Sequence, residues 1–202
     1  MSLTPHTSLL AVAACAALLV GTAGAADPPI AITDASFKCI SEMKAVRHFY
    51  VDNLLGNVAA TQAVAEQGHG EYPVGSVLQL VPNEVMVKQT KGFSPATHDW
   101  EFFYIDVAEH GSKIWKRGAV EVENRFGGNC FGCHAQAKPE FDFVCEDQHG
   151  CAPIPFTRAM FGALQRTDPR CRNAAPASAA DLEALKQLDT LVKSLKAGDK
   201  AN

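Results

Sequence analysis

Residues 76–122 read SVLQLVPNEVMVKQTKGFSPATHDWEFFYIDVAEHGSKIWKRGAVEV, and this stretch decides the fold. Four short runs within it are rich in Val, Ile, Phe, Tyr and Trp, namely 76–81, 84–89, 99–107 and 113–122. Pro, Asn and Gly lie between the runs, and such residues mark turns between β-strands. Because these connections are short, the stretch predicts an antiparallel meander of four strands.

Helical patterns lie on both sides of the predicted sheet. From Ser36 to Asn53 apolar residues recur every three or four positions, which predicts a helix with Asp34 as its N-cap. A second helix should run to Gln67, and further helices should cover 157–164 and 180–196. The sequence therefore predicts an α+β fold, in which helices pack on an antiparallel sheet.

The chain divides into four segments. They are a leader at 1–25, a domain at 26–173, an Ala/Pro/Ser-rich linker at 174–180, and a C-terminal amphipathic helix and tail at 181–202. The last helix carries a stripe of leucines. This stripe predicts packing on the domain, with a homodimer contact as the alternative.

The motif Cys130-Phe131-Gly132-Cys133-His134 is C-x-x-C-H, the attachment site of a c-type haem. Two thiols at this spacing can each bond one vinyl group of a porphyrin, and the adjacent histidine can bind the iron axially. A thioredoxin-like dithiol is one alternative, but no βαβ pattern surrounds the motif. A zinc site is another, since Cys145, His149 and Cys151 follow. We interpret the motif as the site of one covalent haem c.

The N-terminus predicts export. Residues 9–20 form an uncharged apolar run, and Ala23-Gly24-Ala25 fits a signal-peptide cleavage site, which places the protein in the periplasm. Residues 1–8 contain no Lys or Arg, so an uncleaved membrane anchor is the alternative. The formal net charge is −4, and no basic patch indicates binding to nucleic acid.

The seven cysteines support this interpretation. Cys15 belongs to the leader, and Cys130 and Cys133 belong to the motif. An even set remains in an exported chain, which predicts two disulfides among Cys39, Cys145, Cys151 and Cys171. Three pairings are possible. We favour Cys145–Cys151, which closes a short loop, with Cys39–Cys171, and this pairing also removes two ligands from the zinc alternative.

The chain resembles the cytochrome P-460 family, which includes the cytochromes c′-beta. The resemblance covers about residues 36–172. It rests on YVDNLLG at 50–56, YPVGSV at 72–77, DWEFF at 99–103, and the late C-x-x-C-H motif followed by Ala135, Ala137 and Asp142. It implies an antiparallel sheet packed with helices, often in a dimer. It further implies a haem with a proximal histidine, here His134, and an open or weakly held sixth position.

Members of this family bind or process small nitrogen species. Those named for their spectrum oxidise hydroxylamine and carry a lysine cross-linked to the porphyrin, whereas the c′-beta members lack the cross-link and bind nitric oxide in an aromatic pocket. Residues 75–87 contain no lysine, so Lys88 is the first candidate for such a cross-link. The alternative for Lys88 is a solvated lysine on a strand.

Several residues are candidates for the distal side of the haem. Phe102 and Phe103 are neighbours on one strand, so only one of them can face the haem. Glu101 is a candidate proton acceptor, with a solvated strand carboxylate as the alternative. A protein sixth ligand would instead indicate an electron carrier, and the candidates are Met86, Met160, His48, His69, His98, His110 and His149.

The sequence thus predicts an exported mono-haem cytochrome that binds or oxidises hydroxylamine, nitric oxide or a similar small nitrogen compound. Its partners would be that ligand and a redox protein. A six-coordinate electron-transfer cytochrome is the main alternative, and a structural zinc module is a remote one. The sequence leaves open whether the protein is an enzyme or a binding protein.

Overall fold

The computed structural model describes residues 27–172 and 175–199. The predicted signal peptide and its alternative, a membrane anchor, lie outside the described residues. Within the described residues, no helix is long and apolar enough to cross a membrane.

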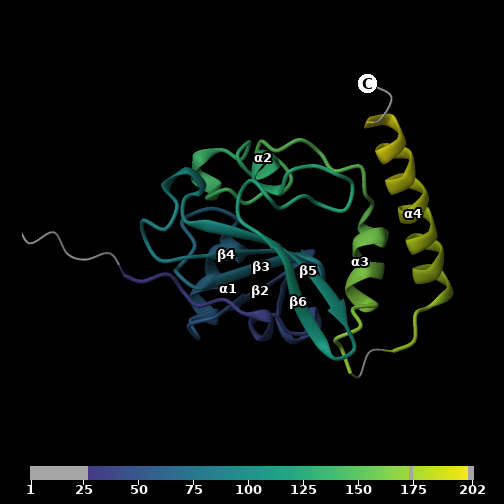
Figure 1. The fold of residues 1–202 in the computed structure, drawn as a ribbon, viewed down its shortest axis with the longest axis horizontal. Helices are drawn as coiled ribbons and strands as arrows, with labels where there is room; N and C mark the ends of the chain where they lie inside the picture. Colours follow the sequence, from purple (N-terminus) through teal and green to yellow (C-terminus); the bar gives the residue numbers. More distant parts are fainter. Residues whose placement is uncertain (1–26, 173–174, 200–202) are drawn as a thin grey trace, which may run out of the picture.

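The core of the fold is one antiparallel sheet of six strands, so the α+β prediction is confirmed (Figure 1). The strands lie in chain order: β1 (Lys44–Val46), β2 (Phe49–Asn53), β3 (Ser76–Val81), β4 (Glu84–Lys88), β5 (Trp100–Ala108) and β6 (Gly111–Arg117). The four strands predicted from residues 76–122 are all present. The fourth is shorter than predicted, since it ends before Gly118, whose φ of 112° favours glycine.

The helix predicted from Ser36 to Asn53 is wrong. This segment forms two short 3-10 helices, η1 (Asp34–Ser36) and η2 (Ile40–Glu42), followed by β1 and β2. In β2 alternate residues are buried, and Tyr50 pairs with Gln79 of β3. The three-residue spacing of Phe37, Ile40 and Met43 arises from successive tight turns, which place all three in one core.

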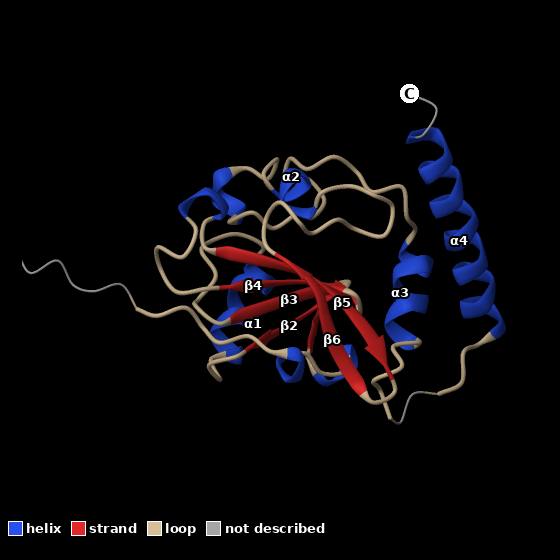
Figure 2. Cartoon of the chain, in the orientation of Figure 1, coloured by secondary structure: helices blue, strands red, loops and turns tan. Residues whose placement is uncertain are grey.

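The helices close the fold around this sheet (Figure 2). They are α1 (Val58–Gln67), α2 (Cys130–His134), α3 (Arg158–Arg166) and α4 (Ala179–Asp199), with two further 3-10 helices, η3 (Pro95–Thr97) and η4 (Pro139–Phe141). The prediction that a second helix ends at Gln67 is confirmed. Gly68 caps it in the left-handed conformation, with φ of 77°.

The C-terminal helix α4 lies beside α3 (Figure 1). Arg166 of α3 forms an ion pair with Asp181 of α4 at 2.5 Å, and Ser178 caps α4 by accepting the Asp181 N–H. Ala184 and Leu188 are buried. Part of the apolar stripe therefore packs on the domain.

The sheet has two differently covered faces. One face packs against the N-terminal segment through Phe37, Ile40, Phe103 and Ile105. The other, which we call the cavity face, carries Leu78, Met86 and Phe102 and lies under the segment that contains α2. Residues on the cavity face therefore decide what can reach the Cys130–His134 motif.

The structure contains two disulfides, one between distant residues and one that closes a short loop. Cys39 bonds Cys171, and Cys145 bonds Cys151, which confirms the favoured pairing. Cys130 and Cys133 are free thiols. Of the six cysteines that the structure describes, only the two in the motif have thiols that can bond a cofactor.

Candidate cofactor site

The motif forms a single helical turn, α2, that is fixed at its first residue. The side chain of Asn129 accepts the Gly132 N–H at 2.7 Å, which caps the turn. The amide group of Asn129 donates in turn to the carbonyl of Ala119 at 3.0 Å, and the Cys130 N–H donates to Val122 at 3.0 Å. These bonds hold the motif against the segment that follows β6.

A cavity of about 230 Å³ separates the cavity face of the sheet from the segment 124–164. Cys130, Cys133 and His134 all contribute to its lining. The rest of the lining is mainly aliphatic and aromatic, and it includes Phe49, Leu78, Leu80, Met86, Phe102, Phe126, Ile154, Phe156 and Phe161. An apolar cavity with a few polar groups suits a hydrophobic cofactor.

His134 is oriented as a metal-binding histidine requires. Its Nδ1–H donates to the carbonyl oxygen of Phe143 at 2.6 Å, which leaves Nε2 as the atom with a free lone pair. Its ring lies 5.3 Å from that of Phe102, centroid to centroid. Burial lowers the pKa of His134, while the bond to Phe143 opposes this shift. The imidazole is therefore neutral near pH 7, as an iron ligand must be.

The two motif thiols are also available. Burial, followed by the nearby Glu84 carboxylate, raises the pKa of Cys130 to about 12, so this thiol is protonated and slow to oxidise. The donor set of two free thiols, one neutral imidazole and an apolar cavity fits a c-type haem. The residues that would hold the group are Cys130, Cys133 and His134.

The zinc alternative finds little support. Cys145 and Cys151 are bonded to each other and cannot act as thiolate ligands. The Nδ1–H of His149 donates to the carbonyl oxygen of Val144 at 2.7 Å, and the His149 ring stacks on Phe141.

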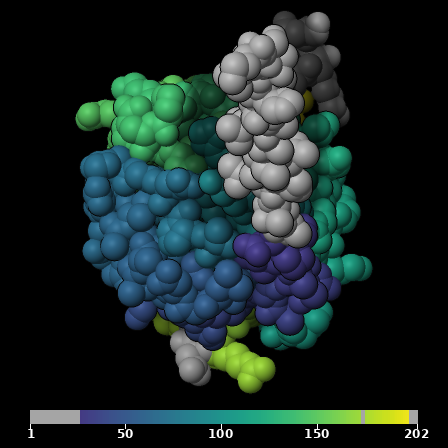
Figure 3. All heavy atoms as spheres, turned by 90° about the vertical axis from the view of Figure 1, so that its left-hand side faces the viewer, coloured from purple at the N-terminus to yellow at the C-terminus, as the bar shows by residue number. Residues whose placement is uncertain are grey.

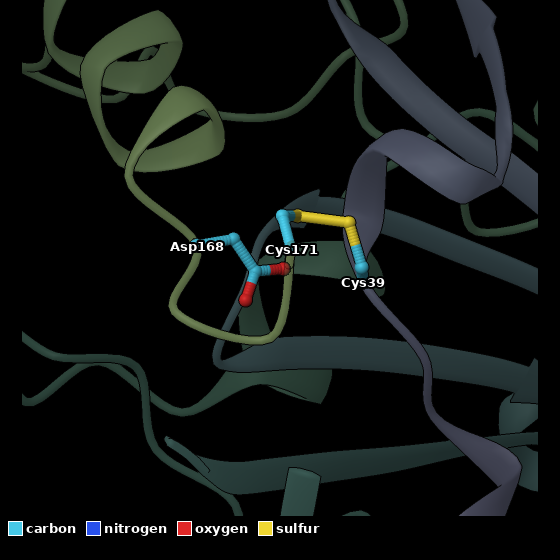
Figure 4. Close-up of side chains that lie close together, drawn as sticks. All are labelled: Cys39, Asp168 and Cys171. Carbon is cyan, nitrogen blue, oxygen red and sulfur yellow. A yellow bond between two sulfur atoms is a disulfide. The ribbon is translucent and has the colours of Figure 1, made fainter. Parts of the chain in front are cut away.

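One cluster of metal-ligand residue types occurs in the described part of the chain, and it lies elsewhere. It comprises Cys39, Asp168 and Cys171 (Figure 4). The two cysteines form a disulfide, and Asp168 accepts the Ile40 N–H and pairs with Arg170. The bonds within this cluster account for it without a metal.

Phe102 and Phe103 face opposite ways, as their adjacent positions require. Phe102 points to the motif, since it packs on both Phe131 and His134. Phe103 lies in the other core, against Phe37 at 5.3 Å. Of these two residues, Phe102 is therefore the one whose ring lies toward the motif.

Glu101 lies on the wrong face of the sheet to act as a proton acceptor at this site. It shares the face of Phe103, where its carboxylate accepts from Gln89 at 2.9 Å and from Arg117 at 2.7 Å. It is buried rather than solvated, so the alternative of a solvated carboxylate is also wrong. Its charge is balanced by Arg117, and it has a structural role there.

Lys88 is on the cavity face but does not line the cavity. Its Nζ lies 2.7 Å from each carboxylate oxygen of Asp142, and only 3% of the residue is exposed. It is therefore not a solvated lysine. A cross-link to a porphyrin would require Nζ to leave Asp142.

Two of the candidate sixth ligands line the cavity, namely His48 and Met86. The buried Nδ1 of His48 has no hydrogen-bond partner among the described residues, and burial lowers the pKa of this ring. Met160 is buried in α3 outside the lining, and His69, His98 and His110 are exposed. Of the candidates, His48 and Met86 are the two placed to contact a cofactor.

Sequence reasoning did not assign a role to Glu84, which lines the cavity. Burial raises the pKa of its carboxyl, although the Arg125 N–H, which donates to Oε1 at 3.2 Å, partly offsets this. The alternation of β4 places Glu84 on the same face as Met86, and this pattern was the available signal. Glu84 is the carboxyl group in the lining that carries a raised pKa.

The chain matches no protein-family model, no curated protein and no solved structure. The resemblance to the cytochrome P-460 family therefore stays a prediction.

Proposed function

We propose that this protein is an exported c-type cytochrome of the cytochrome P-460 type. Cys130 and Cys133 would bond one haem c, and His134 would bind its iron through Nε2. One observation carries the proposal: both free thiols and a histidine with an anchored Nδ1–H line the same apolar cavity. When bound, the haem would supply the redox and ligand-binding chemistry of its iron.

The chain itself would select a small ligand and handle protons. The aliphatic and aromatic lining excludes water and favours small molecules of low charge, such as nitric oxide or hydroxylamine. Oxidation of hydroxylamine releases protons, and Glu84 is the lining group suited to accept one, because burial raises the pKa of its carboxyl and so makes the carboxylate a better base. Binding without turnover would use the same lining but not Glu84.

The first test is covalent attachment. The full chain is expressed with a c-type maturation system, and its intact mass and the spectrum of the reduced protein are recorded with and without carbon monoxide and nitric oxide. We expect the mass of one haem, and a spectrum that both gases change. Cys130→Ser with Cys133→Ser should abolish attachment, whereas Cys39→Ser with Cys171→Ser should not. A wild-type chain without covalent haem would refute the proposal.

The second test separates enzyme from binding protein. Hydroxylamine oxidation is followed with an artificial electron acceptor for the wild type, Glu84→Gln and Glu101→Gln. Glu101 is the matched control, because it is a buried carboxylate on the opposite face of the same sheet. Loss of turnover in Glu84→Gln alone would support the enzyme, and absence of turnover in the wild type would leave nitric oxide binding.

A six-coordinate electron-transfer cytochrome is the second candidate, favoured by the unpartnered Nδ1 of His48 in the lining. In that case the wild-type spectrum should not respond to carbon monoxide. His48→Ala should then open the sixth position, and Met86→Leu serves as the comparison.

A further inference from the structure

Phe143 supplies the carbonyl that holds His134, and its backbone is in an unusual conformation. Asp142 and Phe143 both have positive φ, at 47° and 64°. Consecutive non-glycine residues in this left-handed region are rare, and a bulky residue such as Phe is unfavourable there. The surrounding structure must therefore impose the bend that points the Phe143 carbonyl at Nδ1 of His134.

Three donors from the sheet side of the fold hold Asp142 in place. Its carboxylate accepts the Tyr72 N–H at 2.9 Å and the Lys88 ammonium at 2.7 Å, and its backbone carbonyl accepts the Trp100 indole N–H at 2.7 Å. All four residues are buried. Asp142 is thereby fixed from both its side chain and its backbone.

The neighbouring turns strengthen this attachment. The Gly70 N–H donates to the Glu140 carbonyl at 2.8 Å, and Figure 3 shows the green segment around residue 140 lying on the blue segment around residue 70. Lys88 also lies over the Trp100 ring at 5.1 Å. Lys88 is therefore enclosed by Asp142 and Trp100, the residues that it contacts.

We infer that Lys88 and Asp142 are positioning residues for His134. The buried pair holds residues 142–143 in their left-handed conformation, and this conformation directs the Phe143 carbonyl toward His134. The hydrogen bond to that carbonyl sets the tautomer and the ring orientation of His134. The inference rests on the proposed haem function, because the ring is oriented for an iron ligand. It assigns Lys88 a role that needs no bond to the porphyrin.

A bond from Nδ1–H to a carbonyl raises the basicity of Nε2 and so strengthens donation to a metal. Removing the Lys88–Asp142 ion pair should weaken the hydrogen bond from His134 Nδ1–H to the Phe143 carbonyl. The iron–histidine stretching band of the ferrous protein should then move to lower frequency, and the reduction potential should rise. A role in stability alone would move neither quantity.

The test compares Lys88→Met with Arg170→Met in the haem-loaded chain. Arg170 is a matched control, because it belongs to a second buried ion pair, with Asp168, on a different part of the fold. Resonance Raman spectroscopy gives the stretching band, electrochemical titration gives the potential, and thermal unfolding gives Tm. We expect both variants to lower Tm, and only Lys88→Met to shift the band and the potential.

Unchanged band and potential in folded Lys88→Met would overturn the inference, as would equal shifts in Arg170→Met. If Lys88→Met does not fold, the measurement is repeated with Lys88→Gln, whose side chain is a neutral donor. An unshifted iron–histidine stretching band in that variant would also overturn the inference. If the wild type carries no haem, the proposed function fails by itself. The inference is then decided by nitrogen-15 NMR of His134, where Lys88→Met must lower the Nδ1–H tautomer fraction.

Discussion

The two disulfides allow stability and cavity chemistry to be perturbed separately. Cys39–Cys171 joins residues 132 positions apart, whereas Cys145–Cys151 joins residues six positions apart. In the loop-entropy treatment, the first bond restricts the unfolded chain by about 5 kcal/mol and the second by about 2 kcal/mol. Replacing Cys39 and Cys171 by Ala should therefore be the more destabilising change, by about 3 kcal/mol.

The effects on the cavity should have the opposite order. Cys145 and Cys151 line the cavity, but Cys39 and Cys171 lie beside Asp168, away from the lining. The double Ala variant at 145 and 151 should therefore alter carbon monoxide binding and the spectrum of the reduced protein. The variant at 39 and 171 should leave both unchanged wherever it is folded.

Urea unfolding gives the free energy of unfolding of the wild type and the two double variants. Carbon monoxide titration gives their ligand affinity, which reports on the cavity. The m-value should increase most in the variant at 39 and 171, since its unfolded chain is freed from the longer cross-linked loop and exposes more surface. Equal losses of stability in the two variants would refute the loop-length argument. A change in carbon monoxide affinity confined to the variant at 39 and 171 would refute the placement of the cavity.

Three further predictions concern single side chains. Burial raises the pKa of Glu84 above its ordinary value of 4.5, so the wild-type native state loses stability as the pH rises above 4.5. Glu84→Gln lacks this loss, and urea unfolding should therefore show its free energy of unfolding increasing relative to the wild type between pH 4.5 and neutrality. Phe102→Ala should lower the free energy of unfolding by about 3–5 kcal/mol and speed carbon monoxide binding in flash photolysis. Asn129→Ala removes the cap of α2, so it should cost about 1–2 kcal/mol in urea unfolding and reduce haem attachment measured by mass.

The strands of residues 76–107 were predictable because local rules agree there. Branched and aromatic residues fill the runs, and Pro82 and Asn83 occupy a turn that joins neighbouring strands. In residues 36–53 local rules conflict. Apolar residues every three positions fit a helix, but they also fit 3-10 turns followed by a strand, and the choice depends on pairing with β3, which lies more than twenty residues later.

Which face of β5 lies toward the motif could not be predicted. Alternation shows that Glu101 and Phe102 point to opposite sides, but it does not show which side meets residues 130–134. Once Phe102 is placed on the cavity face, the antiparallel register puts its partner Met86 on the same face. Glu84 then follows as a lining residue, and Glu101 is excluded. One fact from tertiary structure therefore corrects the assignment of both carboxylates.

Lys88 shows the limit of pattern analysis most clearly. Its partner Asp142 is 54 residues away, beyond the reach of any strand or helix periodicity. A buried ion pair is weak grounds for stability, because two apolar residues of similar volume often stabilise a core as well or better. A pair with this arrangement is better explained by what it orients than by what it stabilises. The residue that it orients most directly is Asp142, whose neighbour Phe143 holds His134, so the buried lysine and the motif histidine form one connected site.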